Sequence, residues 1–93
     1  LRALGDCAMR IANFGGNVEF LGDAVIGRLD AHANVLARKG LTITEGGVIE
    51  KGDLTVLGRL DNRGNLVVGG IMKLKWRPGG EGTVYCDRVK RIT

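Results

Sequence analysis

Residues 40–75 read GLTITE GGVIEK GDLTVL GRLDNR GNLVVG GIMKLK, six consecutive units of six residues that each begin with glycine. The pattern extends backwards in the same frame, through GNVEFL and GDAVIG at residues 16–27. Only the two units between these blocks begin with another residue, Arg28 in RLDAHA and Asn34 in NVLARK. A fixed internal repeat of this kind is typical of solenoid proteins, in which each unit packs only on its neighbours.

Within the units, apolar residues occupy alternate positions. The clearest pairs are Val18/Phe20, Ala24/Ile26, Leu41/Ile43, Leu54/Val56, Leu66/Val68 and Met72/Leu74. Alternation indicates a strand with one buried face, and a glycine every six residues would destabilise a helix by about 1 kcal/mol each. We therefore predict a short strand in each unit, followed by a corner at which Gly or Asn adopts a left-handed backbone conformation.

Three units make a coil of 18 residues with three faces, so residues 18 apart should stack. One such column is apolar throughout: Val18, Leu36, Leu54 and Met72. The column that begins at Phe20 includes Arg38, which an apolar core does not accept. We therefore expect a one-residue slip in the middle coil, which moves its other side chains inward. These are Leu29, Val35, Ala37, Leu41 and Ile43. A tighter corner near residues 27–28 and an extra residue near 45–47 would restore the register.

The repeat predicts one all-β domain over residues 1–93, a single-stranded three-faced β-helix of roughly five coils. Its regular coils span about residues 10–75, followed by a loop at 76–82 and terminal strands within 83–93. At about 4.8 Å between neighbouring strands, the stack would be on the order of 25 Å long.

The composition suits thin repetitive layers. Glycine supplies 16 of the 93 residues, well above the usual proportion of roughly 7%, and only four residues are aromatic. No run approaches the roughly 18 apolar residues that span a bilayer, and no signal peptide is visible. Cys7 and Cys86 lack metal-ligand spacing, which favours two thiols in a reducing compartment and a cytoplasmic location.

The residues give little support to an enzyme. His32 is the one histidine and alternates with Asp30 and Asn34, a set that lacks the third strong ligand of a catalytic zinc site. The sequence contains no serine, and its glycine pairs follow no phosphate-loop pattern. We therefore expect no catalytic residues, no bound metal and no cofactor.

The two ends of a solenoid expose strand edges and the cut face of the core, which invite pairing with another chain unless a cap covers them. The sequence has no amphipathic helix long enough to act as a cap, so we expect end-to-end self-association. The candidate interface residues at the N-terminal end are Leu4, Met9, Ile11 and Phe14. Those at the C-terminal end are Val84, Tyr85, Val89 and Ile92.

The net charge of +4 lies entirely in the last quarter of the chain. Its basic residues are Lys73, Lys75, Arg77, Arg88, Lys90 and Arg91. The first three alternate with Met72, Leu74 and Trp76, which predicts an outward basic row and an inward apolar one. Such a surface would suit an anionic membrane, an acidic protein or nucleic acid, or would protect the strand edge through charge repulsion.

The strings GNVEFLGDAVIGRL (residues 16–29) and GDLTVLGRLDNRGNLVVGG (residues 52–70) resemble bactofilins, the polymer-forming bacterial cytoskeletal proteins. The resemblance covers about residues 15–75. It implies a right-handed three-faced β-helix whose ends join into filaments without a nucleotide. It also implies a scaffold for membrane-associated or wall-shaping partners.

Two other classes share this glycine-rich pattern. Hexapeptide-repeat acyltransferases also have coils of 18 residues, but only Leu21-Gly22 with Val25 fits their usual unit well. Tail spikes and fibres of phages form β-helices in which three chains wind together. A virion protein of that kind is the main alternative, and the sequence does not separate an intrachain coil from an intertwined trimer.

Overall fold

The computed structural model describes residues 2–92, which form ten β-strands and no helix. The strands are β1 (Arg2–Ala3), β2 (Cys7–Phe14), β3 (Val18–Phe20), β4 (Ala24–Ala31), β5 (Val35–Ala37), β6 (Leu41–Ile49), β7 (Leu54–Val56), β8 (Leu60–Asn62), β9 (Asn65–Leu74) and β10 (Thr83–Arg91). All pairings between these strands are parallel. The chain is a β-solenoid of about five coils, as the six-residue repeat predicts.

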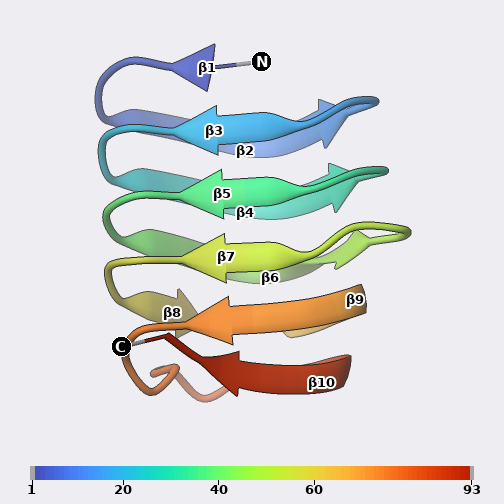
Figure 1. Ribbon diagram of the computed structural model, residues 1–93. Coiled ribbons are helices and arrows are strands. Elements are labelled where there is room, and N and C mark those ends of the chain that lie inside the picture. Colours follow the sequence, from blue (N-terminus) through green and yellow to red (C-terminus); the bar gives the residue numbers. More distant parts are fainter. Residues whose placement is uncertain (1, 93) are drawn as a thin grey trace.

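Each coil has three faces. The first face carries residues 7–9, 24–26, 41–43 and 60–62, and the second carries 11–14, 28–31, 46–49, 65–68 and 83–86. The third face is formed by β1, β3, β5, β7 and the ends of β9 and β10. The long strands β2, β4 and β6 bend from the first face to the second, and Figure 1 shows the third face nearest the viewer.

The winding is right-handed. In Figure 1 the chain descends from the N-terminus, the near strands β3, β5 and β7 run to the left, and the more distant β2, β4 and β6 run to the right. The coil therefore turns clockwise as it moves away from an observer at the N-terminal end. This is the hand that parallel strand–crossover–strand connections almost always adopt.

The core fills the inside of the solenoid with aliphatic side chains. Every residue of the alternating pairs that the sequence predicts as inward is buried, from Val18 and Phe20 to Met72 and Leu74. The largest of these side chains, Phe20, stacks between two small ones, Ala3 and Ala37. Alternation of large and small residues along this column lets adjacent coils keep the strand spacing of the sheet.

Coil length varies along the chain. Cys7 pairs with Ala24, 17 residues further on. Val35 pairs with Leu54, 19 residues further on, and Leu54 pairs with Met72, 18 residues further on. The spacing of 18 predicted from the repeat is thus the average of unequal coils.

The predicted slip is confirmed for the inward side chains, since Leu29, Val35, Ala37, Leu41 and Ile43 are all buried. Val35, not Leu36, continues the column that begins at Val18. The predicted extra residue is confirmed too. The register shifts between Ile26 and Arg28, opposite the segment from Ile43 to Gly46 in β6. The predicted tight corner at residues 27–28 is present as well: β4 bends there from the first face to the second with only Gly27 between Ile26 and Arg28, whereas β6 has two residues between Ile43 and Gly46.

The role predicted for the corner glycines is wrong at most positions. Among residues 2–92, only Gly46 and Gly80 have positive φ angles, of 126° and 90°, and Asn34 does not. A Cβ on Gly52 would instead lie 2.2 Å from the carbonyl carbon of Ala33, one coil earlier. Glycine recurs here because successive coils approach too closely for a side chain.

Polar side chains link the coils at the corner between the second and third faces. The Asn17 Oδ1 accepts a hydrogen bond from the N–H of Asn34 at 3.1 Å, and the Asn34 Oδ1 accepts one from the N–H of Asp53 at 2.9 Å. The Asp53 Oδ1 accepts the next from the N–H of Ile71 at 2.8 Å. Corner N–H groups lie outside the strand ladder, so these side chains replace the missing acceptors.

A second ladder of the same kind runs along the corner between the third and first faces. There the Asp6 Oδ1 accepts a hydrogen bond from the N–H of Asp23 at 2.8 Å, and the Asp23 Oδ1 accepts one from the N–H of Gly40 at 2.9 Å. Both ladders join residues one coil apart, so they fix where each coil turns.

Candidate functional site

The N-terminal end of the solenoid leaves four inward side chains of its first coil half-covered: Ala3, Cys7, Met9 and Phe14. They pack against the buried core cluster, and Ala12 in the same coil is itself buried. Their stacking partners one coil further in, Phe20, Ala24, Ile26 and Ala31, are at most 1% exposed. Since the described residues place no coil above β1 and β2, apolar core surface faces outward at this end.

Of the residues predicted at the N-terminal interface, Met9 and Phe14 lie on this open core surface. The Phe14 ring meets Phe20 edge to face at 6.0 Å between centroids. Leu4 follows β1 at the corner and is 75% exposed. Ile11, in contrast, points outward from the second face with 67% exposure, so the structure places it on the side of the solenoid.

The C-terminal end is open in the same way. Val84 and Cys86 in β10 are half-buried on top of Leu66 and Val68. Val89 stacks on the buried Met72 yet is itself 58% exposed, because the described chain adds no coil beyond β10. The inner surface of β10 is therefore apolar and accessible at Val84, Cys86 and Val89.

The other residues predicted at this end have different positions. The N–H of Ile92 donates to the carbonyl of Leu74 at 2.8 Å, which holds the half-buried Ile92 at the outermost corner. Tyr85 points outward from the second face and follows Val48 and Val67 in a partly exposed apolar stripe. Arg91 pairs with Leu74, so a cation continues an otherwise apolar column.

The segment between β9 and β10 crosses the first face as a loop instead of a regular strand. Gly79 forms a bridge with Asp61, and its N–H donates to the carbonyl of Leu60 at 2.7 Å. The buried Asn62 side chain holds the loop by donating to the carbonyl of Thr83 at 3.1 Å and accepting from the N–H of Gly64 at 3.2 Å. The loop is thus fixed to the last complete coil.

Trp76 departs from the sequence prediction. Met72 and Leu74 point inward as expected, but the chain leaves the third face after Leu74 and Trp76 is 51% exposed. Its side chain lines a small apolar slot of about 120 Å³ with Leu74, Pro78 and Val89, and the side chains of Arg77 and Arg91 complete the walls.

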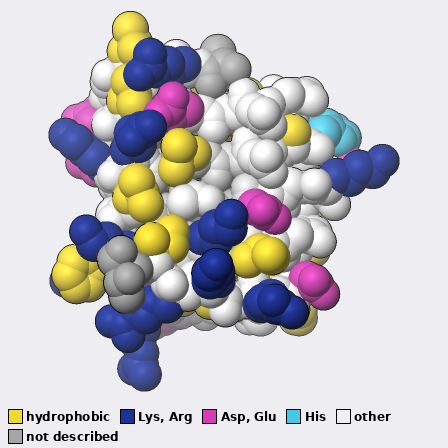
Figure 2. Space-filling view, viewed as in Figure 1, with side chains coloured by type: hydrophobic (Ala, Val, Ile, Leu, Met, Phe, Trp, Pro, Cys, Tyr) yellow, Lys and Arg dark blue, Asp and Glu magenta, His cyan; other side chains and the backbone are white. Residues whose placement is uncertain are grey.

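Two of the basic residues predicted as a surface, Arg77 and Arg91, line this slot, and the other four lie along β9 and β10 or directly after β9. Lys73 and Lys90 are paired residues on adjacent strands, and Arg91 lies next to Lys90 along β10. Figure 2 shows dark-blue side chains gathered in the lower part of the near face, over β9 and β10, with apolar side chains between them. We call Lys73, Lys75, Arg77, Arg88, Lys90 and Arg91 the basic patch.

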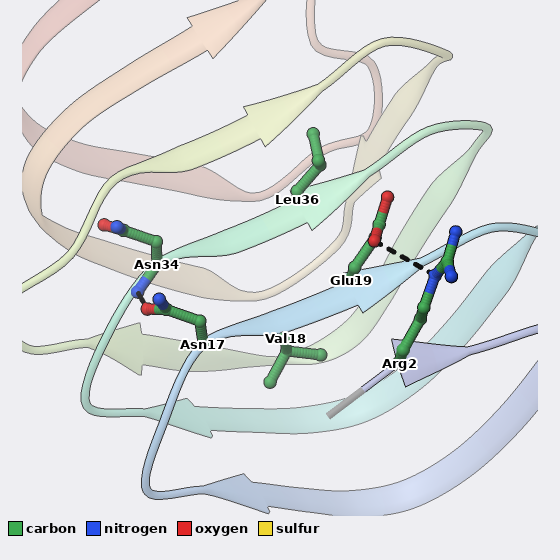
Figure 3. Close-up of a pocket in the computed structure, with 6 residues that line it drawn as sticks. All are labelled: Arg2, Asn17, Val18, Glu19, Asn34 and Leu36. Atoms are coloured by element: carbon green, nitrogen blue, oxygen red, sulfur yellow. Dashed lines mark hydrogen bonds and ion pairs between the residues drawn. The ribbon is translucent and has the colours of Figure 1, made fainter.

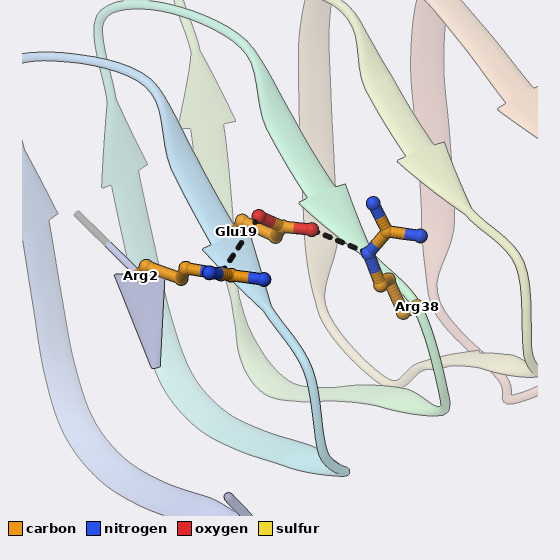
Figure 4. Close-up of polar contacts among 3 residues, drawn as sticks. All are labelled: Arg2, Glu19 and Arg38. Carbon is orange, nitrogen blue, oxygen red and sulfur yellow. Dashed lines mark hydrogen bonds and ion pairs between the residues drawn. The ribbon is translucent and has the colours of Figure 1, made fainter. Parts of the chain in front are cut away.

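A shallow hollow of about 380 Å³ lies near the N-terminal end of the third face, between Arg2, Glu19 and Leu36 (Figure 3). Glu19 interacts with two arginines: Arg2 Nε lies 3.2 Å from its Oε1, and Arg38 Nε hydrogen-bonds to its Oε2 (Figure 4). The hydrogen bond from Arg38 lowers the pKa of the Glu19 carboxyl, and the charges of both arginines add to this effect. Because its charge is already matched, Glu19 stabilises the coils against one another.

The remaining candidate residues lie apart from the two ends or on opposite ends of the solenoid. His32 Nδ1 lies 2.8 Å from Glu50 Oε2, one coil further on, and both side chains are about half exposed. Within residues 2–92, no three His, Cys, Asp or Glu side chains gather as a metal site would require. Cys7 and Cys86 are free thiols at opposite ends, and burial, with a smaller contribution from Asp6, raises the pKa of Cys7.

No protein-family model matches the chain, and no curated protein or solved structure matches it significantly. Among the described residues, no helix is long and apolar enough to cross a membrane.

Proposed function

We propose that this chain is a structural subunit that joins end to end into filaments without a nucleotide and serves as a cytoplasmic, bactofilin-like scaffold. The observation that carries the proposal is that, within residues 2–92, no further coil or cap covers either end of the solenoid. Apolar core side chains such as Met9 and Val89 are accessible there, and one coil further in the equivalent positions are buried. A second copy stacked on either end would bury this surface as the internal coils do.

The edge strands support the same proposal. β1 lies at one end and β10 at the other, and each pairs with a described strand on one side only. Unpaired N–H and C=O groups along an exposed edge are a template for strand addition. The free edges of the two ends match face by face: β1 and the end of β10 lie on the third face, and the end of β2 and the start of β10 lie on the second.

The alternative is a virion protein of the trimeric β-helix class. One observation favours it: Val48, Val67 and Tyr85 form a partly exposed apolar stripe along the second face, where side-by-side contact with other chains would cover them. The coil itself closes within one chain, so three chains are not needed to bury the core.

Negative-stain electron microscopy and analytical ultracentrifugation of the purified chain, with and without added nucleotide, test the proposal. We expect filaments under both conditions. Val89→Asp places a charge on the open C-terminal core surface and should abolish filaments without unfolding the coil. Val25→Asp is the matched control, because Val25 is an exposed strand valine on the side of the solenoid, at 43% exposure.

Several outcomes would contradict the proposal. A strict monomer at high concentration would refute end-to-end assembly. A stable trimer without filaments, disrupted by Tyr85→Asp, would support the virion alternative. Binding of acyl-coenzyme A by such a trimer would instead support an acyltransferase.

A further inference from the structure

Trp76 is the exposed aromatic residue that the fold leaves without an evident structural role. The alternation of Met72 and Leu74 predicts that the side chain at position 76 points inward. The Trp76 side chain is instead 51% exposed, beside Pro78 and Val89. An indole ring combines a large apolar area with one N–H donor, and such residues prefer the boundary between apolar and aqueous phases.

The charged residues that line the slot with Trp76 are both arginines, Arg77 and Arg91. Lys73 forms a long ion pair with Asp53, at 3.8 Å, and the other five members of the basic patch form no ion pair with a described residue. Glu81 and Asp87 are the only acidic residues beyond residue 69. The basic patch therefore keeps most of its charge available for an external anionic partner.

We infer that the basic patch and Trp76 dock this edge of the solenoid on an anionic lipid bilayer. Each lysine or arginine near such a surface strengthens binding about fivefold, which corresponds to about 1 kcal/mol. The apolar slot between Arg77 and Arg91 places Trp76 and Val89 between the cations, so they can enter the headgroup region while the charges meet lipid phosphates.

A bilayer fits this arrangement better than nucleic acid does. Phosphates of a bilayer or of a nucleic acid would both neutralise the cations. The exposed Pro78 and Val89 beside the indole, however, gain nothing from contact with a nucleic-acid backbone. A bilayer surface binds cations through its phosphates and aliphatic groups through its acyl chains, so it would contact both kinds of residue in the patch. Nucleic acid, which can also stack on an indole, becomes one outcome of the test.

The patch remains usable whether or not the subunits assemble. Lys73, Lys75 and Trp76 belong to or directly follow β9, one coil inside the end, and Lys73 projects from the third face of the solenoid. A second copy stacked on β10 would leave these three residues accessible but would cover Val89, which the proposed filament interface shares. The basic residues of the third face therefore do not depend on the proposed filament, and a filament would repeat them and bind more tightly through multivalency.

Trp76 is the only tryptophan, so its fluorescence reports directly on docking. We expect a blue shift and protection from acrylamide quenching with vesicles of 30% phosphatidylserine in phosphatidylcholine. Vesicles of phosphatidylcholine alone should cause neither change, and salt should weaken the response because it screens the charges. Cosedimentation with the same vesicles gives the partition coefficient without relying on the indole.

The test variant Lys75→Gln/Arg77→Gln/Lys90→Gln should lower that partition coefficient about a hundredfold. The matched control, Arg10→Gln/Arg28→Gln/Lys51→Gln, removes the same charge from exposed positions elsewhere and should change it less than threefold. Trp76→Ala should reduce cosedimentation as well. Equal losses in the test and control variants would show nonspecific attraction and overturn the inference.

Two further outcomes would also overturn it. One is the absence of cosedimentation with anionic vesicles at low salt. The other is salt-sensitive binding of a DNA or RNA oligonucleotide with no response to vesicles. Microscopy of the test variant without lipid keeps the two proposals separate, because loss of vesicle binding with intact filaments concerns the patch alone.

Discussion

Gly69 offers the sharpest test of how the coils pack. A Cβ at this position would lie 2.1 Å from the carbonyl oxygen of Glu50 and 2.8 Å from its carbonyl carbon, whereas ordinary contacts begin at 3.4 Å. Both obstructing atoms belong to the backbone of the previous coil, so no side chain can rotate away. In Gly69→Ala, β9 must move more than 1 Å away from β6 immediately after Val68, which pairs with Ile49.

The expected loss of stability follows from this displacement. Overpacking of a rigid site usually destabilises by about 1–3 kcal/mol, and each weakened ladder hydrogen bond adds up to about 1 kcal/mol. We therefore expect Gly69→Ala to lower the free energy of unfolding by about 3 kcal/mol. For a domain of this size, that corresponds to a fall in Tm on the order of 15 °C.

Gly16→Ala is the matched control, because a Cβ there meets no atom within 4 Å and the residue has no positive φ. It should be neutral, or stabilise the fold by about 0.4–1 kcal/mol through the unfolded chain. Urea unfolding followed by circular dichroism, in a Val89→Asp background that prevents assembly, measures both variants. Equal destabilisation by the two substitutions would refute the packing argument and favour conformational freedom at the corners instead.

Three other changes test single interactions. Asn34→Ala removes the acceptor of the Asp53 N–H, so urea unfolding should show a loss of about 1 kcal/mol, and no change would mean that water replaces the amide. Because the Glu19 pKa is lowered in the folded state, its stabilisation is complete above the ordinary pKa of about 4.3 and disappears as pH falls through the lowered value. Glu19→Gln should therefore flatten acid unfolding below about pH 4.3, and superimposable curves for the two proteins would contradict this. With Cys86→Ser present, alkylation of Cys7 by iodoacetamide should have its pH midpoint above about 8.5, and a midpoint at or below that value would show a more solvated thiol.

The inward face of the solenoid was predictable from sequence because burial on one side of a strand imposes a period of two. The same rule located the slip, since Arg38 cannot occupy the column of Phe20, and Ala37 takes that place. The number of residues in each coil was harder to predict from sequence, because a corner accepts an additional residue with little effect on the strands that flank it. One signal was present: Asp6 and Asp23, like Asn17 and Asn34, recur at 17 residues, the length of the first coils.

The candidate ends were predictable only in part. The sequence pointed to apolar residues near each terminus, but whether such a residue faces the core or the side depends on local register. Met9 and Phe14 lie on the open core surface, and Ile11 lies on the side. Trp76 shows a second limit, since alternation predicts an inward side chain only while the strand continues, and β9 ends at Leu74.

The unequal lengths of the coils ensure that each coil pairs with its correct neighbours. In a solenoid of identical coils, a chain shifted by one whole coil would regain nearly all its contacts, and copies could exchange coils freely. Here the extra residue of β6 opposite Ile26 and Arg28, and the longer path from Val35 to Leu54, match only their own neighbours. A shifted or exchanged pairing would leave residues without partners and break the corner hydrogen bonds. The unequal number of residues per coil therefore disfavours exchange of internal coils between copies. Pairing with other copies is confined to the strands at the two ends.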